Sequence, residues 1–234
     1  MQPTHYCDLI CRMRPRARRH RMTIGSVHQV ATLILLAGIG IGAPDGSFAA
    51  ATPGPAAVVT GLVVGVGRLI GDSGLSARDR EREFARLLQE DCDLPRVSRY
   101  ALGAYLAAAS APERQEFSGL FQRWVTRSFV DKIGRIDASQ FKVIGTHADG
   151  DGTIVSTELD APGDKPLQIE WRLYEDDNQY RIADVAIEGI SMALVEREEM
   201  SAVLRRNGGS VARLNHALEQ RLASEETSTA SATP

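Results

Sequence analysis

The sequence predicts an α+β fold, in which N-terminal helices are followed by a four-stranded curved antiparallel sheet and two C-terminal helices around an apolar cavity. Two observations lead to this expectation. Apolar residues recur with a helical period of about 3.6 before residue 134 and after residue 191, and they alternate with a period of two in between. Short turn-forming stretches separate the alternating segments, and turns of this length join antiparallel strands.

The first 49 residues have the pattern of a cleaved secretory signal peptide. Six arginines over residues 12–21 precede an uncharged run over residues 23–44. Small side chains at Ser47, Ala49 and Ala51 then fit cleavage near residue 49. A retained membrane anchor is the alternative, because the uncharged run is about as long as the roughly 20 residues of a spanning helix.

The composition of the exported chain disfavours several classes of function. Without residues 1–49 the chain keeps 21 basic and 28 acidic side chains, a net charge of −7, so no nucleic acid is expected as a partner. Cys92 is then the single cysteine, which excludes a disulfide scaffold. His147 and His216 are the remaining histidines and have no metal-binding or triad-like spacing, so metal and nucleophilic catalysis have little support.

Composition also sets the expected boundaries. We predict a signal peptide over 1–49, a flexible mature N-terminus over 50–57, one folded domain over 58–223 and a disordered tail over 224–234. The domain opens with the glycine-containing segment "AVVTGLVVGVGRLIGD". A nucleotide-binding loop would require a preceding strand and βαβ repeats, so an apolar helix is the favoured interpretation.

Capping residues predict where the next helices begin. Ser76 precedes a helix that runs to Glu90, and Asp93 precedes a second one with Pro95 in its first turn. The stretch "SAPE" at 110–113 is a capping box that starts a third helix. The apolar residues of this third helix share one face: Phe117, Leu120, Phe121, Trp124, Val125 and Phe129.

Four strands are expected over residues 141–148, 153–159, 166–175 and 180–189. Their turns contain "DGDG" and "EDDNQ". In the third strand one face carries Leu167, Ile169, Trp171 and Leu173. Two helices then follow over 191–206 and 210–222, separated by the helix stop "NGG".

The last strand leads into a helix almost without a connection, in the stretch "DVAIEGISMALVEREEM". Ala183, Val185 and Ile187 are expected on one face of the strand, Gly189 permits a bend, and Ser191 can cap the helix. The helix must therefore fold back on the sheet. An apolar space is expected between them, and its proposed lipid-contacting residues are Phe121, Trp124, Phe129, Val143, Val155, Ile169, Trp171, Leu173, Val185, Ile187, Met192 and Val195. A solid core would use the same residues.

Three stretches resemble the MlaC family of periplasmic phospholipid-binding proteins, also known as toluene-tolerance proteins. The first is "LGAYLAAASAPERQEFSGLFQRWV", and the second is "DVAIEGIS" with Arg197 and Met200 after it. The third is the closing "LRRNGGSVARLNHAL". The chain departs from the family at Glu196, where an aromatic residue is frequent, and at Met200, where phenylalanine is frequent.

The resemblance implies a monomeric carrier in the periplasm with a phospholipid as cargo, no catalytic activity and no cofactor. Its implied partners are an outer-membrane lipoprotein complex and an inner-membrane ABC transporter with an MCE-domain subunit. Three alternatives stay open: a carrier of hopanoids or other lipids from the same superfamily, a ligand-free adaptor, and an enzyme of the NTF2-like architecture. The enzyme would use Asp184, Glu170 or Glu158 as a general base in an apolar cone.

Overall fold

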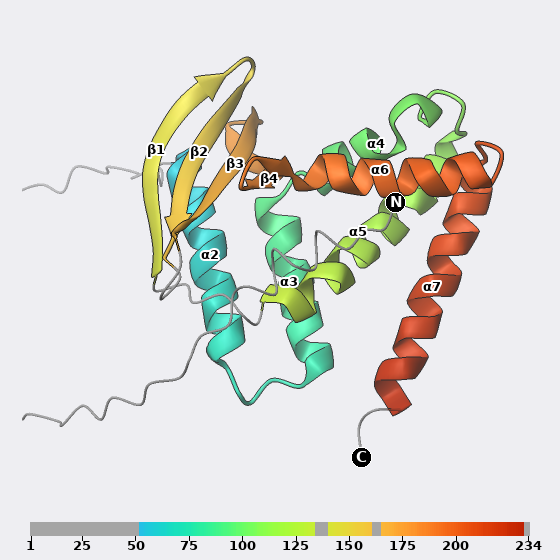
Figure 1. Ribbon diagram of the computed structural model, residues 1–234, viewed down its shortest axis with the longest axis horizontal. Coiled ribbons are helices and arrows are strands. Elements are labelled where there is room, and N and C mark those ends of the chain that lie inside the picture. Colours follow the sequence, from blue (N-terminus) through green and yellow to red (C-terminus); the bar gives the residue numbers. More distant parts are fainter. Residues whose placement is uncertain (1–51, 134–139, 161–164, 232–234) are drawn as a thin grey trace, which may run out of the picture.

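The computed structural model describes residues 52–133, 140–160 and 165–231, so the predicted signal peptide over 1–49 lies outside the described part of the chain. Helices, an antiparallel sheet and two further helices follow one another as expected, which confirms the α+β fold class. Figure 1 shows the sheet at one end of the molecule, α7 at the opposite end and α6 running between them. Among the described residues, no helix is both long and apolar enough to cross a membrane.

The helices before the sheet begin at the predicted caps. The helices α2 (Pro55–Gly71) and α3 (Ala77–Asp91) form a pair, and α4 (Leu94–Leu102), a 3-10 turn (Gly103–Tyr105) and α5 (Ala111–Ile133) follow. The side chains of Ser76 and Asp93 accept hydrogen bonds from the backbone N–H of Asp79 and Arg96, at 3.1 and 2.9 Å. Ser110 and Glu113 close the predicted capping box.

The flexible N-terminus was predicted too long. Helix α2 already begins at Pro55, so residues 55–57 are helical although they were expected to be flexible. Proline is favoured in the first turn of a helix because its missing N–H has no intrahelical partner there in any case. Composition alone did not reveal that "PGPAA" contains a helix start.

In the described part of the chain, five strands form one antiparallel sheet in sequence order. They are β1 (Phe141–Asp149), β2 (Gly152–Leu159), β3 (Leu167–Asp176), β4 (Gln179–Ile187) and the two-residue β5 (Ile190–Ser191). The fifth strand was not predicted. It exists because Glu188 and Gly189 both have positive φ, 50° and 77°, and form a two-residue turn that lets Ile190 pair with Ile187.

A bulge in β4 changes which residues face the helices. The register shifts between Arg172 and Leu173, so that Leu173 pairs with Ile182 while Arg172 pairs with Asp184. Ala183 is the extra residue, and Ile182 rather than Ala183 is fully buried, at 2% exposure. Strict alternation through Ala183, Val185 and Ile187 therefore did not predict that Ile182 also faces the interior.

The chain ends in α6 (Met192–Arg206) and α7 (Val211–Ser231). The predicted disordered tail is helical as far as Ser231, so that prediction was wrong for residues 224–231. Ion pairs from α7 to the neighbouring helices explain the difference: Glu226 pairs with Arg123 at 3.0 Å and lies 3.8 Å from Arg127. A composition rich in Ser, Thr and Glu does not reveal such partners.

Two apolar cores hold the elements together. The first lies between the sheet and α2 and α3, and it includes the ends of α4 and α5. The second joins α4, α5, α6 and α7. Helix α5 belongs to both, because Phe117, Phe121 and Trp124 pack in the second core while Val125 and Phe129 also reach the first.

Candidate functional site

An apolar cavity of about 240 Å³ lies between the sheet and the helices. Almost no polar atom reaches its surface. Residues from α2, α3, α4, α5, α6 and all four long strands line it: Leu62, Val63, Val66, Gly67, Ile70, Phe84, Leu88, Cys92, Leu94, Val97, Val125, Phe129, Phe141, Leu159, Ile169, Trp171, Ile182, Ala183, Asp184, Val185, Ile187, Met192, Ala193 and Glu196. Apolar residues from distant parts of the chain therefore converge on one space between the sheet and the helices.

The sheet wall is centred on Trp171 of β3. Its indole Nε1 donates a hydrogen bond of 2.9 Å to Thr157 Oγ1, and that hydroxyl donates one of 3.0 Å to the Ile169 carbonyl. The ring of Phe141 meets the Trp171 ring edge to face at 6.3 Å. Both polar atoms are satisfied within the sheet, so the indole can present its apolar surface to the cavity.

Helix α2 supplies the facing wall, which the sequence interpretation did not assign. Its lining residues Leu62, Val66 and Ile70 are spaced four apart and thus share one helical face. Gly65 lies on the side toward α3, where a Cβ atom would meet the Leu87 side chain at 2.9 Å. This glycine permits close packing of two helices, which accounts for its place in the segment that resembled a nucleotide loop.

Asp184 organises the junction between β4 and α6. Its Oδ1 accepts hydrogen bonds from the backbone N–H of Val185 and Ala193, at 2.8 and 2.9 Å, and its Oδ2 accepts one of 2.6 Å from the Ser191 hydroxyl. Ser191 Oγ in turn accepts from the backbone N–H of Leu194 at 3.1 Å. The predicted cap at Ser191 is confirmed, and Asp184 holds it in place.

The three acids suggested as a general base are either engaged in hydrogen bonds or exposed to solvent. Asp184 is bound at three points by the strand-to-helix junction. Glu158 accepts a hydrogen bond from Gln168, and Glu170 is exposed to solvent. A further acid, Glu196, is buried in the cavity wall and accepts a hydrogen bond of 2.9 Å from the indole Nε1 of Trp124. None of these four acids stands in the cavity without a partner.

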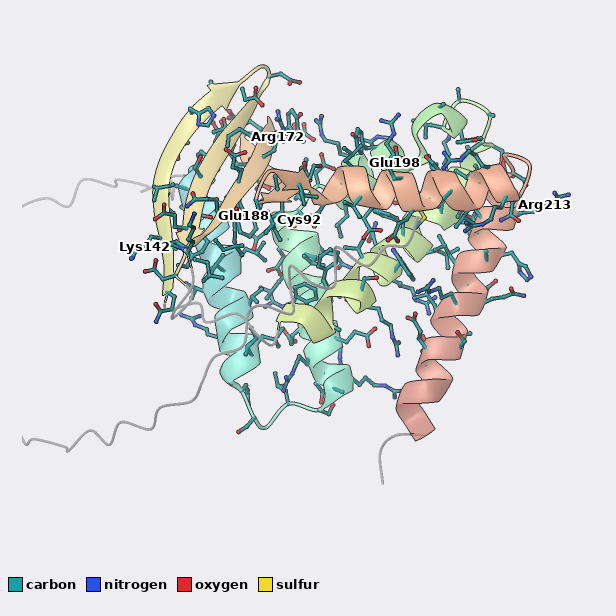
Figure 2. The ribbon with its side chains drawn as sticks, in the orientation of Figure 1. Cys92, Lys142, Arg172, Glu188, Glu198 and Arg213 are labelled. Carbon is teal, nitrogen blue, oxygen red and sulfur yellow. The ribbon has the colours of Figure 1, made fainter. Side chains whose placement is uncertain are left out.

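Cys92 contributes a buried thiol to the cavity wall, close to where the sheet meets the helices (Figure 2). Burial, with a smaller contribution from the charge of Asp91, raises the pKa of Cys92 to about 12. The thiol is therefore protonated at neutral pH and behaves as a small apolar side chain. In the described part of the chain, no three His, Cys, Asp or Glu side chains are placed to hold a metal ion.

Half of the proposed lipid-contacting residues lie in the cavity wall: Phe129, Ile169, Trp171, Val185, Ile187 and Met192. The remaining six do not line it. Val155 and Leu173 are fully buried within the first core, on the same face of the sheet as Trp171 but outside the cavity lining. Val195 is half-buried on α6.

Phe121, Trp124 and Val143 lie away from the cavity lining for identifiable reasons. Phe121 and Trp124 turn into the second core, because α5 crosses from one core to the other. Val143 is 40% exposed, since it lies on the edge strand β1 beside a bulge. A helical or alternating pattern tells which face is apolar, but not which neighbour covers it.

Comparison with known proteins agrees with this geometry. The family model described as MlaC protein matches residues 71–220. A solved structure of the phospholipid-binding protein from Ralstonia solanacearum, in complex with a phospholipid, is similar to this chain with 19% sequence identity and a TM-score of 0.58. The alignment covers 72% of this chain and 96% of that one. The two proteins share a fold, and because the family model spans more than half of the sequence, the chain belongs to the MlaC family.

Proposed function

We propose that this protein is a periplasmic phospholipid carrier, which moves lipid without catalysis between an outer-membrane lipoprotein complex and an inner-membrane ABC transporter with an MCE-domain subunit. The observation that carries the proposal is the apolar cavity between the sheet and the helices. Membership of the MlaC family supports it, as does the fold shared with a protein that was solved with a phospholipid.

The physical requirement for a carrier is to keep acyl tails out of water. Each methylene costs about 0.8 kcal/mol to expose, so two chains of about 15 methylenes each cost roughly 20 kcal/mol or more. A wall with almost no polar atoms removes that cost, and the headgroup can remain in water. The buried hydrogen bond of Trp171 to Thr157 contributes here, because it keeps the one polar atom of the indole away from the tails.

The cavity is smaller than the cargo requires. Two acyl chains call for a volume near or above the upper end of the usual range of about 300 to 1,000 Å³, and the cavity measures about 240 Å³. We propose that the helices move away from the sheet when two acyl chains are loaded. Met192 and Phe129 lie in the cavity wall, and the unbranched methionine side chain can repack around acyl chains of different shape.

The two rivals from other classes are less well supported. A ligand-free adaptor predicts a filled interior, whereas the space beside Trp171 is hollow. An enzyme of the NTF2-like type needs an acid that projects freely into the cone, whereas Asp184 is engaged at the junction and Glu196 by Trp124. A hopanoid carrier would need the same apolar wall, so only the extracted cargo separates it from a phospholipid carrier.

Native mass spectrometry of the chain without residues 1–49 tests the proposal. The protein is purified from a bacterial periplasm without detergent, and its mass is compared before and after organic extraction. We expect an added mass that extraction removes and that lipid analysis identifies as phospholipid. Protein that is recovered empty and also fails to take up phospholipid from vesicles would overturn the carrier proposal. If the extracted lipid is a hopanoid, the cargo is a hopanoid and not a phospholipid.

A further inference from the structure

Two large apolar side chains are exposed where α6 leaves the sheet (Figure 1). Ile190 is 46% exposed and Leu194 is 47% exposed. Both adjoin the cavity wall, because Ile190 pairs with Ile187 between β4 and β5, and Leu194 directly follows Met192 and Ala193. Paired residues of neighbouring strands point to the same face of a sheet, so Ile190 continues the apolar wall from Ile187 to the protein surface.

A strained turn holds Ile190 in this exposed position. Glu188 and Gly189 have φ values of 50° and 77°, and the left-handed conformation is unfavourable for a residue with a side chain. Two hydrogen bonds fix the turn: the Glu188 N–H donates to the Gln168 carbonyl at 2.9 Å, and Glu188 Oε1 accepts from the Gln168 N–H at 2.7 Å. Figure 2 shows Glu188 at the edge of the sheet beside the start of α6. The turn therefore keeps a large apolar side chain at the surface.

Tyr100 of α4 extends the apolar surface beside Leu194. Arg197 lies one turn after Leu194 on the same side of α6, and its guanidinium carbon is 4.9 Å from the centre of the Tyr100 ring. The arginine side chain also crosses Gly103, where a Cβ atom would lie 3.0 Å from Arg197 Nε. The Tyr100 side chain is still 41% exposed. Ile190, Leu194 and Tyr100 are called the exposed apolar patch below.

We propose that the exposed apolar patch is the surface with which the protein contacts a phospholipid bilayer while it takes up or releases lipid. This inference rests on the proposed carrier function. An acyl chain that leaves the cavity has to reach another apolar phase without crossing water, because every exposed methylene is unfavourable. A patch that continues the cavity wall offers that route. Tyrosine suits the membrane interface, since its ring is apolar and its hydroxyl is polar.

The size of the patch favours a bilayer over a protein as the partner. Even a large aromatic side chain contributes only about 150 to 250 Å² when it is fully buried. The three side chains of the patch are each less than half exposed, so their combined free area is well below the roughly 800 Å² that each partner buries in a stable protein interface. Shallow insertion between lipid headgroups requires only a few apolar side chains.

Ile190→Thr combined with Leu194→Gln removes two apolar side chains from the patch. Ile144→Thr combined with Val64→Gln is the matched control, because Ile144 and Val64 are 52% and 41% exposed and neither lines the cavity. In the chain without residues 1–49, co-flotation with phosphatidylcholine vesicles and phospholipid transfer between two vesicle populations are measured. The patch variant is expected to lose about tenfold in both, and the control to stay within about twofold of the wild-type chain.

Extraction of lipid from the same proteins separates this inference from the carrier proposal. Lipid per protein is expected to be equal in the two double variants, because none of the four substituted residues lines the cavity. Protein that holds no lipid would contradict the carrier function. Lipid-loaded protein whose two double variants float and transfer equally well would overturn the bilayer contact and assign the patch to a protein partner.

Leu194→Trp tests the contact through a gain of binding. Tryptophan favours the bilayer interface, so this variant is expected to bind vesicles more tightly than the wild-type chain and to add a fluorescence that shifts to the blue. Ile144→Trp is its control and is expected to show neither effect. Arg197 and Glu198, of opposite charge, lie one turn after Leu194, so binding is expected to persist at high salt. Equal shifts in the two variants, or release of the protein by salt, would contradict an apolar contact at the patch.

Discussion

The carboxylate of Asp184 accepts a hydrogen bond of 2.6 Å from the hydroxyl of Ser191, seven residues further along the chain. The same carboxylate accepts the backbone N–H of Ala193 in the first turn of α6, and Ser191 caps that helix through Leu194. One acid thus fixes the direction in which α6 leaves the sheet. Since Met192 and Ala193 form part of the cavity wall, this bond also shapes the cavity.

Asp184→Ala is expected to lower the free energy of unfolding by about 3 kcal/mol, because it removes the acceptor of three hydrogen bonds at a half-buried junction. Ser191→Ala alone is expected to cost about 1 kcal/mol, as for loss of a helix cap. Urea unfolding of both single variants and of the double variant measures their coupling. In the Asp184→Ala background, Ser191→Ala is expected to lower the free energy of unfolding clearly less than it does in the wild-type chain. Fully additive losses would show that the two side chains do not act together.

Filling the cavity separates a binding site from a structural core. Val66→Phe places a larger side chain on the face of α2 that lines the cavity, so it is expected to lower the lipid recovered with the protein while stability is kept or raised. Val64→Phe is the matched control, because Val64 is 41% exposed on the same helix and does not line the cavity. Lipid per protein is measured by extraction, and stability by urea unfolding. Equal lipid content in the two variants would show that the acyl tails do not occupy this cavity.

Capping signals in the sequence predicted where α3, α4, α5 and α6 begin. Ser76, Asp93, Ser110 and Ser191 each precede a helix and cap it within three residues, so no tertiary information was needed to find them. Short turns of fixed type likewise fixed the order of the strands. The fold class follows from these signals together.

Which residues line the cavity depends on how the helices and the sheet pack together, and the local sequence pattern does not encode that packing. The apolar stripe of α5 looked continuous, but Phe121 and Trp124 are covered by α7 and α6, while Phe129 reaches the sheet side. The α2 wall was missed because the small and branched residues of "LVVGVG" carry no signal beyond helix formation. The way the helices cross decides which of several apolar faces borders the cavity, and hydrophobic periodicity does not contain that information.

The thiol of Cys92 provides a pH-dependent test of cavity burial. Because burial raises the pKa of Cys92 to about 12 from an ordinary value of 9.0, the folded state keeps the proton that the unfolded state loses. Its contribution to stability is present below about pH 9 and is lost as the pH rises toward about 12. From about pH 8 to about pH 10 the loss is about 1.4 kcal/mol.

Other groups titrate in this range as well, so the measurement compares the wild-type chain with Cys92→Ala, both without residues 1–49. From about pH 8 to about pH 10, the free energy of unfolding of the wild-type protein is expected to fall by about 1.4 kcal/mol more than that of the variant. A disulfide reagent at about pH 8 is expected to modify Cys92 only in urea. Parallel pH profiles, or rapid modification of the native protein, would show that the thiol is open to solvent.

The last turns of α7 are expected to stabilise the protein, contrary to what their composition indicates. Arg127 of α5 has a side chain that is 15% exposed, and it lies between Glu81 of α3 and Glu225 and Glu226 of α7, at 3.6, 4.0 and 3.8 Å. A chain that ends at Ser224 is expected to lose about 1 kcal/mol of stability in urea unfolding, and the loss is expected to shrink at high salt, where partly exposed pairs are screened. A chain that ends at Ser231 is the control, since it keeps every one of these contacts. If both truncated chains unfold at the same urea concentration, the ion pairs around Arg127 contribute nothing measurable, and residues 225–231 can be removed without cost.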